Sequence, residues 1–243
     1  MPTILAIDTS ATPVSCAILR DDRVLVSYFS HTGLTHSQTL MPMIESALET
    51  ARMSVSDMDA LAVTAGPGSF TGVRIGVAAV KGLAFADDLP CISVSTLSAM
   101  ARNVQGLPFK GVVCCAMDAR CRQVYCALFA QDSNGTQHRL TPDEAISIDT
   151  LRERLVGYDQ PIMFIGDGAQ VCYDALSDAL PNSVLAPLSV RLQCAVGVAL
   201  EARDAFERGE TVDAQALLPT YLRLPQAERE LRSRQAAEAT TGK

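Results

Sequence analysis

The feature of this 243-residue chain that most constrains its fold is an order of predicted elements that occurs twice. In each half, three strands precede an alternating series of helix, strand, helix, strand and helix. Each half also opens on an apolar strand that ends in aspartate, Leu5-Ala6-Ile7-Asp8 in the first and Cys115-Ala116-Met117-Asp118 in the second. Two such matches in the same register indicate an internal duplication. The pattern therefore predicts an α/β protein built from two similar lobes.

Hydrophobic periodicity and turn residues place the individual elements. In the first half we expect strands at 3–9, 14–20, 23–30, 59–65 and 90–94, with helices at 37–52, 70–86 and 95–103. In the second half we expect strands at 111–118, 123–131, 136–140, 161–166 and within 181–187, with helices at 149–156, 168–179 and 189–208. The turn at Gly106 and Pro108 divides a lobe of residues 1–106 from one of residues 107–224, and a charged tail follows at 225–243.

Composition excludes several classes of function. The net charge is −7, and outside the tail there is no cluster of lysine and arginine, so we expect contact with nucleic acid only through a partner. Eight cysteines without a Cys-x-x-Cys pair and only three histidines argue against a metal site. The N-terminus lacks a basic leader, and the apolar stretch 75–86 is too short to cross a bilayer. We expect a cytosolic protein that binds no membrane.

A glycine-rich stretch, Gly66-Pro67-Gly68-Ser69-Phe70-Thr71-Gly72-Val73-Arg74-Ile75-Gly76, follows a strand and opens a helix. Glycines at a helix N-terminus can let the backbone approach an anion. They can equally serve close packing through Gly72 and Gly76. We expect Ser69 to cap the helix.

The order of elements resembles the duplicated fold of actin, sugar kinases and heat-shock chaperone ATPases. Specific motifs narrow the resemblance to the bacterial TsaB family, also called YeaZ, from residue 4 to about residue 224. They are the glycine-rich stretch together with Ile4-Leu5-Ala6-Ile7-Asp8-Thr9-Ser10, His36-Ser37-Gln38, Val94-Ser95-Thr96-Leu97, Met117-Asp118-Ala119-Arg120 and Pro219-Thr220-Tyr221-Leu222-Arg223.

This resemblance implies a subunit of the machinery that installs threonylcarbamoyl on the adenosine beside the tRNA anticodon. It also implies the partners. A catalytic homologue, TsaD, forms a heterodimer with the subunit; the subunit forms a homodimer when alone; the ATPase TsaE joins the pair; and tRNA is reached only through the complex.

The sequence predicts a non-catalytic subunit. The catalytic relative holds a metal through a His-x-x-x-His pair, whereas the matching segment here, residues 95–102, contains neither histidine nor carboxylate. The two hairpins that would contact nucleotide phosphates lack glycine, so we expect no catalytic residue, metal or cofactor. At most we expect a vestigial nucleotide site at Asp8, Thr9, Ser10 and Asp118. The alternatives are a free-standing actin-fold phosphotransferase or ATPase, and a self-associating module without a role in tRNA modification.

Two helices carry more apolar surface than one core contact requires. On the 37–52 helix the apolar arc is wider than an ordinary surface helix presents, and the only charges of the 70–86 helix are Arg74 and Lys81. These helices are either fully covered within the lobe or shared with a partner, and the family resemblance favours sharing. We therefore expect Val77→Glu or Val80→Glu to break association without unfolding the lobe. The expected partner interface comprises His36, Leu40, Met41, Ile44, Leu48, Val73, Arg74, Val77, Val80 and Lys81.

Overall fold

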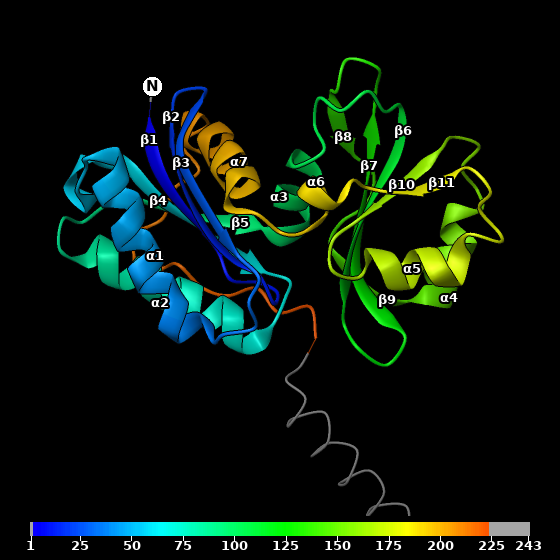
Figure 1. The fold of residues 1–243 in the computed structure, drawn as a ribbon, viewed down its shortest axis with the longest axis horizontal. Helices are drawn as coiled ribbons and strands as arrows, with labels where there is room; N and C mark the ends of the chain where they lie inside the picture. The colour runs from blue at the N-terminus through cyan, green and yellow to red at the C-terminus, as the bar shows by residue number, and fades with distance from the viewer. Residues whose placement is uncertain (1, 224–243) are drawn as a thin grey trace, which may run out of the picture.

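A computed structural model of the chain describes residues 2–223 and contains two mixed sheets side by side (Figure 1). The first sheet has the strand order β3-β2-β1-β4-β5, and its strands are β1 (Thr3–Asp8), β2 (Val14–Arg20), β3 (Arg23–Ser30), β4 (Ala60–Gly66) and β5 (Cys91–Ser95). The second has the order β11-β10-β6-β7-β8, with β9 also paired to β7. Its strands are β6 (Gly111–Asp118), β7 (Gln123–Gln131), β8 (Gln137–Arg139), β9 (Glu144–Ser147), β10 (Ile162–Ile165) and β11 (Ser183–Leu185).

The two sheets share one topology. In the first, β1 pairs antiparallel with β2 and parallel with β4, while β3 and β5 extend the sheet on either side. In the second, β6 takes the place of β1, with β7 antiparallel on one side and β10 parallel on the other. The predicted duplication and the two-lobed actin-like fold are confirmed.

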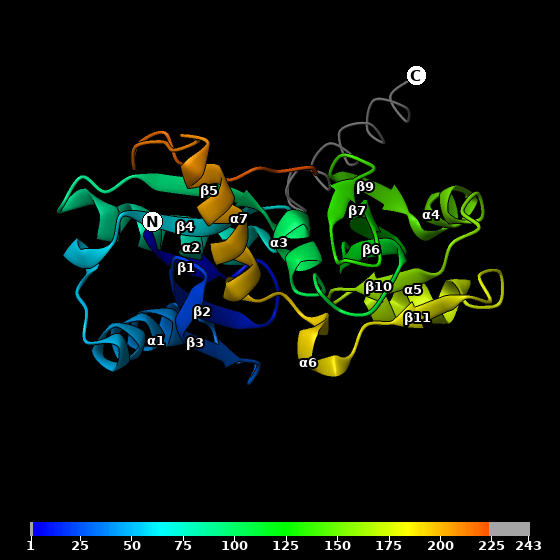
Figure 2. The ribbon, with the colours of Figure 1, turned by 90° about the horizontal axis from the view of Figure 1, so that it is seen from above.

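Helices cover both faces of each sheet. They are α1 (His36–Ala51), α2 (Phe70–Phe85), α3 (Thr96–Arg102), α4 (Ile148–Leu155), α5 (Ala169–Leu176), α6 (Leu188–Arg191) and α7 (Ala195–Glu207), with a short 3-10 helix at Val55–Asp57. Helices α1 and α2 pack on the outer face of the first sheet, and α4 and α5 on the outer face of the second. Helices α3 and α7 lie between the sheets (Figure 2). Within residues 2–223 no helix has the length and apolar character needed to cross a membrane.

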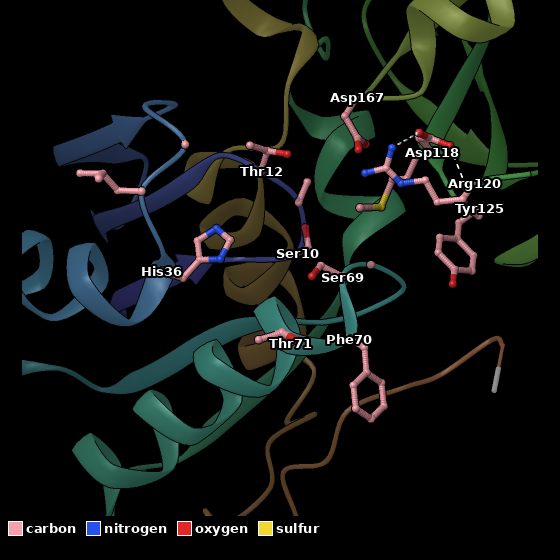
Figure 3. Close-up of a pocket in the computed structure, with 16 residues that line it drawn as sticks. Ser10, Thr12, His36, Ser69, Phe70, Thr71, Asp118, Arg120, Tyr125 and Asp167 are labelled. Carbon is pink, nitrogen blue, oxygen red and sulfur yellow. Dashed lines mark hydrogen bonds and ion pairs between the residues drawn. The ribbon is translucent and has the colours of Figure 1, made fainter. Parts of the chain in front are cut away.

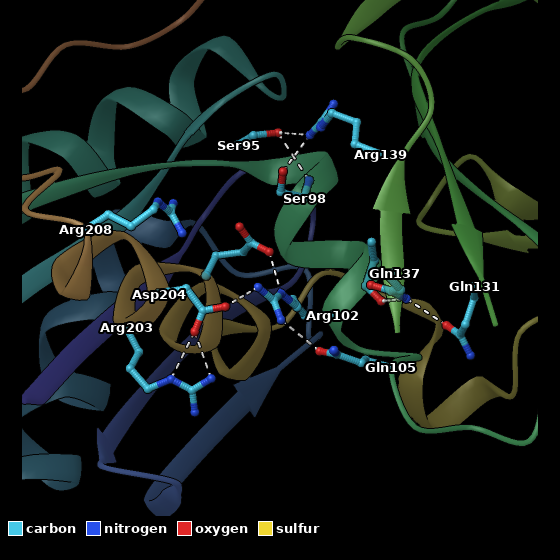
Figure 4. Close-up of polar contacts among 12 residues, drawn as sticks. Ser95, Ser98, Arg102, Gln105, Gln131, Gln137, Arg139, Arg203, Asp204 and Arg208 are labelled. Carbon is cyan, nitrogen blue, oxygen red and sulfur yellow. Dashed lines mark hydrogen bonds and ion pairs between the residues drawn. The ribbon is translucent and has the colours of Figure 1, made fainter. Parts of the chain in front are cut away.

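Polar contacts join the lobes through these two inner helices (Figure 4). Arg102 on α3 pairs with Glu201 and Asp204 of α7. From the second sheet, the guanidinium of Arg139 donates to Ser98 Oγ on α3 at 2.5 Å. The amide of Gln137 donates to the carbonyl of Ala101 at 2.8 Å. Helix α3 is therefore bonded on one side to α7 and on the other to the second lobe.

The prediction of a single helix at 189–208 was wrong. The structure breaks it at residues 192–194, between α6 and α7. There the carbonyl of Leu192 accepts from the Asn103 side chain at 2.9 Å, and Gln193 is buried with its amide on Asp167. These contacts with both lobes replace the helical hydrogen bonds. Strand β9 was not predicted, because its four residues are all only half-buried and lack a clear alternation.

The lobes do not follow the predicted division at residue 106. Helix α7 comes after the second sheet in the chain but packs on β1, β2 and β4 of the first. Beyond α7, Val212 forms an antiparallel bridge with Cys91, and Leu217 is buried in the core of the first lobe. The C-terminal part of the predicted second lobe thus belongs by its packing to the first. The tail predicted at 225–243 lies outside the described residues.

Candidate functional site

A cleft of about 540 Å³ opens between the two lobes (Figure 3). Its walls are the β1–β2 turn and the start of α2 on one side, and the β6–β7 turn on the other. Polar side chains on these walls include Ser10, Thr12, His36, Ser69, Thr71, Asp118, Arg120, Tyr125 and Asp167. A cleft of this size fits a small-molecule ligand.

The two predicted hairpin aspartates close equivalent turns. Asp8 Oδ1 accepts the backbone N–H of Ser10 at 2.9 Å, and Asp118 Oδ1 accepts that of Arg120 at 2.8 Å. The two lobes therefore share not only the order of their elements but also this hydrogen bond at the end of their first strands. Of the four residues predicted as a vestigial nucleotide site, Ser10 and Asp118 line the cleft, whereas Asp8 and Thr9 are buried beneath it.

The actin-like fold implies a nucleotide, but the turns present here fit phosphate poorly. The N–H of Ser10 is held by Asp8, and the N–H of Ser69 donates to the carbonyl of Ser10 at 2.7 Å. The N–H of Gly72 donates to the Ser69 hydroxyl, which confirms the predicted cap. These three N–H groups, which could otherwise hold a phosphate, are therefore bonded within the protein itself.

The glycine-rich loop packs on the first hairpin. A Cβ at Gly72 would lie 2.1 Å from the carbonyl oxygen of Thr9, and one at Gly76 would lie 2.4 Å from the Thr9 hydroxyl. The packing role considered for these two glycines is thus confirmed. The Thr9 hydroxyl in turn donates to the carbonyl of Gly72 at 2.8 Å. The glycines hold α2 against β1 rather than opening a space for a ligand.

Burial shifts the pKa of two carboxyl groups, one beneath the cleft and one in its wall. Burial raises the pKa of the Asp8 carboxyl, although hydrogen bonds from Ser10 and Thr64 act in the opposite direction. Burial also raises the pKa of Asp167, and the nearby charges of Asp118 and Asp8 add to the effect. Loss of solvent disfavours the ionised form in both cases.

Sequence reasoning missed Asp167. Its carboxylate accepts from the Gln193 amide at 2.6 Å and lines the cleft. A usable signal existed, because Asp167 follows the strand β10 in a Gly-Asp-Gly turn just as Asp8 and Asp118 end β1 and β6. Tyr125 was also missed, since nothing in an alternating strand distinguishes a cleft-lining residue.

Half of the residues predicted at the partner interface serve the core of their own lobe. Each is at most 5% exposed, so the structure contradicts its prediction as an interface residue. They are Leu40, Ile44, Val73, Val77 and Val80. A glutamate at Val77 or Val80 would therefore unfold the lobe rather than only break association. Apolar residues lie on more than one face of these helices, and the sequence alone did not show which face packs against the sheet.

The other predicted interface residues lie nearer the surface. Met41 and Arg74 are exposed, while His36 and Leu48 are half-buried. His36 begins α1 rather than preceding it, and its Nε2 lies 3.2 Å from the carbonyl oxygen of Pro13. The Lys81 ammonium donates to the carbonyls of Gln215 and Leu217 at 3.1 and 3.2 Å, so it binds its own chain.

Residues 208–223 form a segment that we call the C-terminal strap. It runs from the end of α7 past β5 and along α2 to the cleft (Figure 2). The N–H of Thr220 donates to the carbonyl of Ala65 at 2.7 Å, and the Tyr221 ring stacks on Phe70. At its end, Arg223 donates to the carbonyl of Ala119 in the second lobe at 2.6 Å.

The chain is similar to known proteins in sequence and in fold. The family model of the tRNA N6-adenosine threonylcarbamoyltransferase TsaD matches residues 30–231. The chain is 35% identical over 233 residues to the tRNA threonylcarbamoyladenosine biosynthesis protein TsaB of Bacillus subtilis, covering 93% of this chain and 96% of that protein. It is also 35% identical over 220 residues to TsaB of Escherichia coli, covering 90% and 94%. The solved structure of YeaZ from Pseudomonas aeruginosa superposes with a TM-score of 0.75 at 31% identity, covering 91% of this chain and 100% of that one.

Proposed function

Because the chain belongs to the TsaB family of tRNA threonylcarbamoyladenosine biosynthesis proteins, we propose that it acts there as a non-catalytic subunit that binds a TsaD-like homologue. The homologue supplies the active site, a TsaE-like ATPase joins the pair, and the chain pairs with itself when alone. Two local features support the non-catalytic role. The hairpin donors are bonded internally, and the segment 95–102 contains no metal ligand of the catalytic kind.

The observation that carries the proposal is the outer face of α2. Exposed Ala78 and Gly82 lie one turn apart on it, one turn after exposed Arg74. Half-buried Ile75, Ala79 and Leu83 lie on its flank, where they also pack against the core of the lobe. At the end of the helix Phe85 is 80% exposed. An outer face of mostly small or apolar residues, opposite an apolar inner face, is typical of a helix that is covered on both sides.

Gly82 is the most informative residue of this face. A Cβ built there meets nothing within 4 Å, in contrast to Gly72 and Gly76 of the same helix. The lobe itself therefore does not require a glycine at this position. A second helix packed closely against α2 would require it, because a missing side chain lets two backbones approach.

Neighbouring α1 extends the same surface. Helices α1 and α2 lie side by side on the outer face of the first lobe (Figure 1). Met41 on α1 is 39% exposed. We call this surface, formed by Met41, Ala78, Gly82 and Phe85, the outer α1–α2 face. A stable interface centred on it would bury about 1,600 Å² over both partners.

Depletion of the chain in its own cells tests the proposal. The level of threonylcarbamoyladenosine in tRNA, measured by mass spectrometry of nucleosides, should fall on depletion. The wild-type chain should restore it, and so should Val171→Glu, which places a charge at an exposed valine of the second lobe. Ala78→Glu should not restore it. An unchanged nucleoside level after depletion would refute the proposal, and ATP turnover by the isolated chain would favour a free-standing ATPase instead.

A further inference from the structure

An exposed pair of aromatic rings lies at the mouth of the cleft. The ring centroids of Phe70 and Tyr221 are 4.8 Å apart, with the planes tilted by 30°. Phe70 is 36% and Tyr221 44% exposed, and Phe70 also lines the cleft. The hydrogen bond from Thr220 to Ala65 fixes the strap directly before Tyr221. The pair is therefore a preorganised apolar surface that remains open to solvent.

One arginine of the strap and one of the second lobe lie at the same mouth. Arg223 reaches from the strap to the carbonyl of Ala119, the residue before Arg120. The side chain of Arg120 lines the cleft and is 85% exposed, and its guanidinium lies 3.3 Å from the carboxylate of Asp118, which lines the same cleft. The fold thus gathers guanidinium groups that are distant in sequence, although the whole chain carries a charge of −7.

Tyr125 completes this surface from the side of β7. It lines the cleft below Arg120, opposite Phe70 (Figure 3). We name the set of Phe70, Arg120, Tyr125, Tyr221 and Arg223 the cleft rim. Three aromatic rings between two guanidinium groups combine the two chemistries that recognise unpaired nucleotides, namely base stacking and phosphate pairing.

We propose that the cleft rim binds an unpaired nucleotide of single-stranded RNA. A base would stack on an exposed tyrosine ring, and Arg120 and Arg223 would pair with the flanking phosphates. The inference goes beyond the proposed function, in which RNA is reached only through the partner. The acidic remainder of the chain makes this contact weak by itself, so it would add to the RNA affinity of the assembled complex.

An acidic polypeptide is the other ligand that arginines could attract. The arginines alone would be enough to bind such a polypeptide, and the stacked, exposed pair of Phe70 and Tyr221 would then have no role. The rings therefore favour RNA. They also separate this site from the turns at the bottom of the cleft, where Ser10 and Ser69 bond within the protein.

Fluorescence anisotropy with a labelled RNA hairpin that carries a single-stranded loop tests the proposal. It would be measured at low salt on the full chain and on its complex with the catalytic homologue. Tyr221→Ala should weaken binding roughly tenfold, whereas Tyr221→Phe should retain it. Arg120→Gln should weaken binding and lower the dependence on salt by about 0.7 in the logarithmic slope. Arg152→Gln, an equal loss of charge per residue at an exposed site on α4, should change neither.

Three results would overturn the inference. They are no binding at low salt by chain or complex, wild-type affinity in both Tyr221→Ala and Arg120→Gln, and displacement by polyglutamate as effective as by RNA. Arg120→Gln alters only an exposed side chain, so it tests RNA binding even where Tyr221→Ala disturbs the strap. Retained affinity of the rim variants for the catalytic homologue would separate this site from the outer α1–α2 face. Failure of the wild-type chain to bind the homologue, with RNA binding intact, would contradict the proposed function and leave this inference standing.

Discussion

Two adjacent leucines of the C-terminal strap should differ sharply in their effect on stability. Leu217 is fully buried in the core of the first lobe, whereas Leu218 is 65% exposed. Truncating a buried leucine to alanine removes its transfer free energy and leaves a cavity, and typically costs about 2–5 kcal/mol. Surface truncation usually stays within about 0.5 kcal/mol. Leu217→Ala should therefore lower the free energy of unfolding by several kcal/mol, and Leu218→Ala should hardly change it.

The assay is equilibrium unfolding in urea, followed by circular dichroism for both variants and the wild type. A loss of about 3 kcal/mol at Leu217 corresponds to more than a hundredfold change in the folding equilibrium. Limited proteolysis adds a local measure, because a released strap should be cut earlier. If the two variants were equally stable, the strap would not be part of the first core, and its packing on α2 and β5 would be refuted.

Further predictions concern the strap, the joint between the lobes and the cleft. Gly66→Ala should speed hydrogen exchange at the Thr220 amide, because a Cβ there would lie 2.2 Å from the Thr220 oxygen; Gly106→Ala, also at positive φ but with open space, should leave that amide protected. Arg102→Gln should destabilise the chain by about 1–3 kcal/mol, since Glu201 and Asp204 lose their partner in a half-buried site. Arg208→Gln removes an exposed ion pair and should hardly change the free energy of unfolding in the same assay. Equal losses of stability for Arg102→Gln and Arg208→Gln would contradict a stabilising role of Arg102 between α3 and α7. Asp8→Asn should gain stability relative to the wild type as the pH rises above about 4, the pKa of an unfolded aspartate. The reason is that burial raises the pKa of Asp8 in the folded protein, so ionisation at higher pH destabilises the wild type. Melting temperatures of both proteins between pH 4 and 7 measure the difference, and a difference that shrinks as the pH rises would contradict the prediction.

The repeated order of elements was enough to predict most of the fold. Strands β6 and β7 have the predicted bounds, and α2 ends one residue early. Local patterns succeed here because each element buries one face in its own lobe. They failed at residues 192–194, where hydrogen bonds to Asn103 and Asp167 outweigh helix propensity. No local signal reports a contact with a residue so far away in the chain.

The surface residues were harder to predict than the core. An amphipathic pattern ranks residues by hydrophobicity, so it selected Val77 and Val80, which turned out to be the inner face. The outer face consists of small residues such as Ala78 and Gly82, which carry little hydrophobic signal. The cleft rim could not be predicted from the sequence for another reason. Arg120 and Arg223 are far apart in the chain, and Arg223 reaches the residue before Arg120 only because the strap crosses between the lobes.

Calorimetric titration of the chain with its TsaD-like homologue tests the central claim most directly. We predict a complex between equal numbers of the two proteins, and a loss of at least a hundredfold in affinity for Ala78→Glu, because an unpaired carboxylate would be buried at the outer α1–α2 face. Val171→Glu should bind like the wild type. A complex that forms equally well with Ala78→Glu, while that variant retains its fold, would contradict the assignment of this face to the partner.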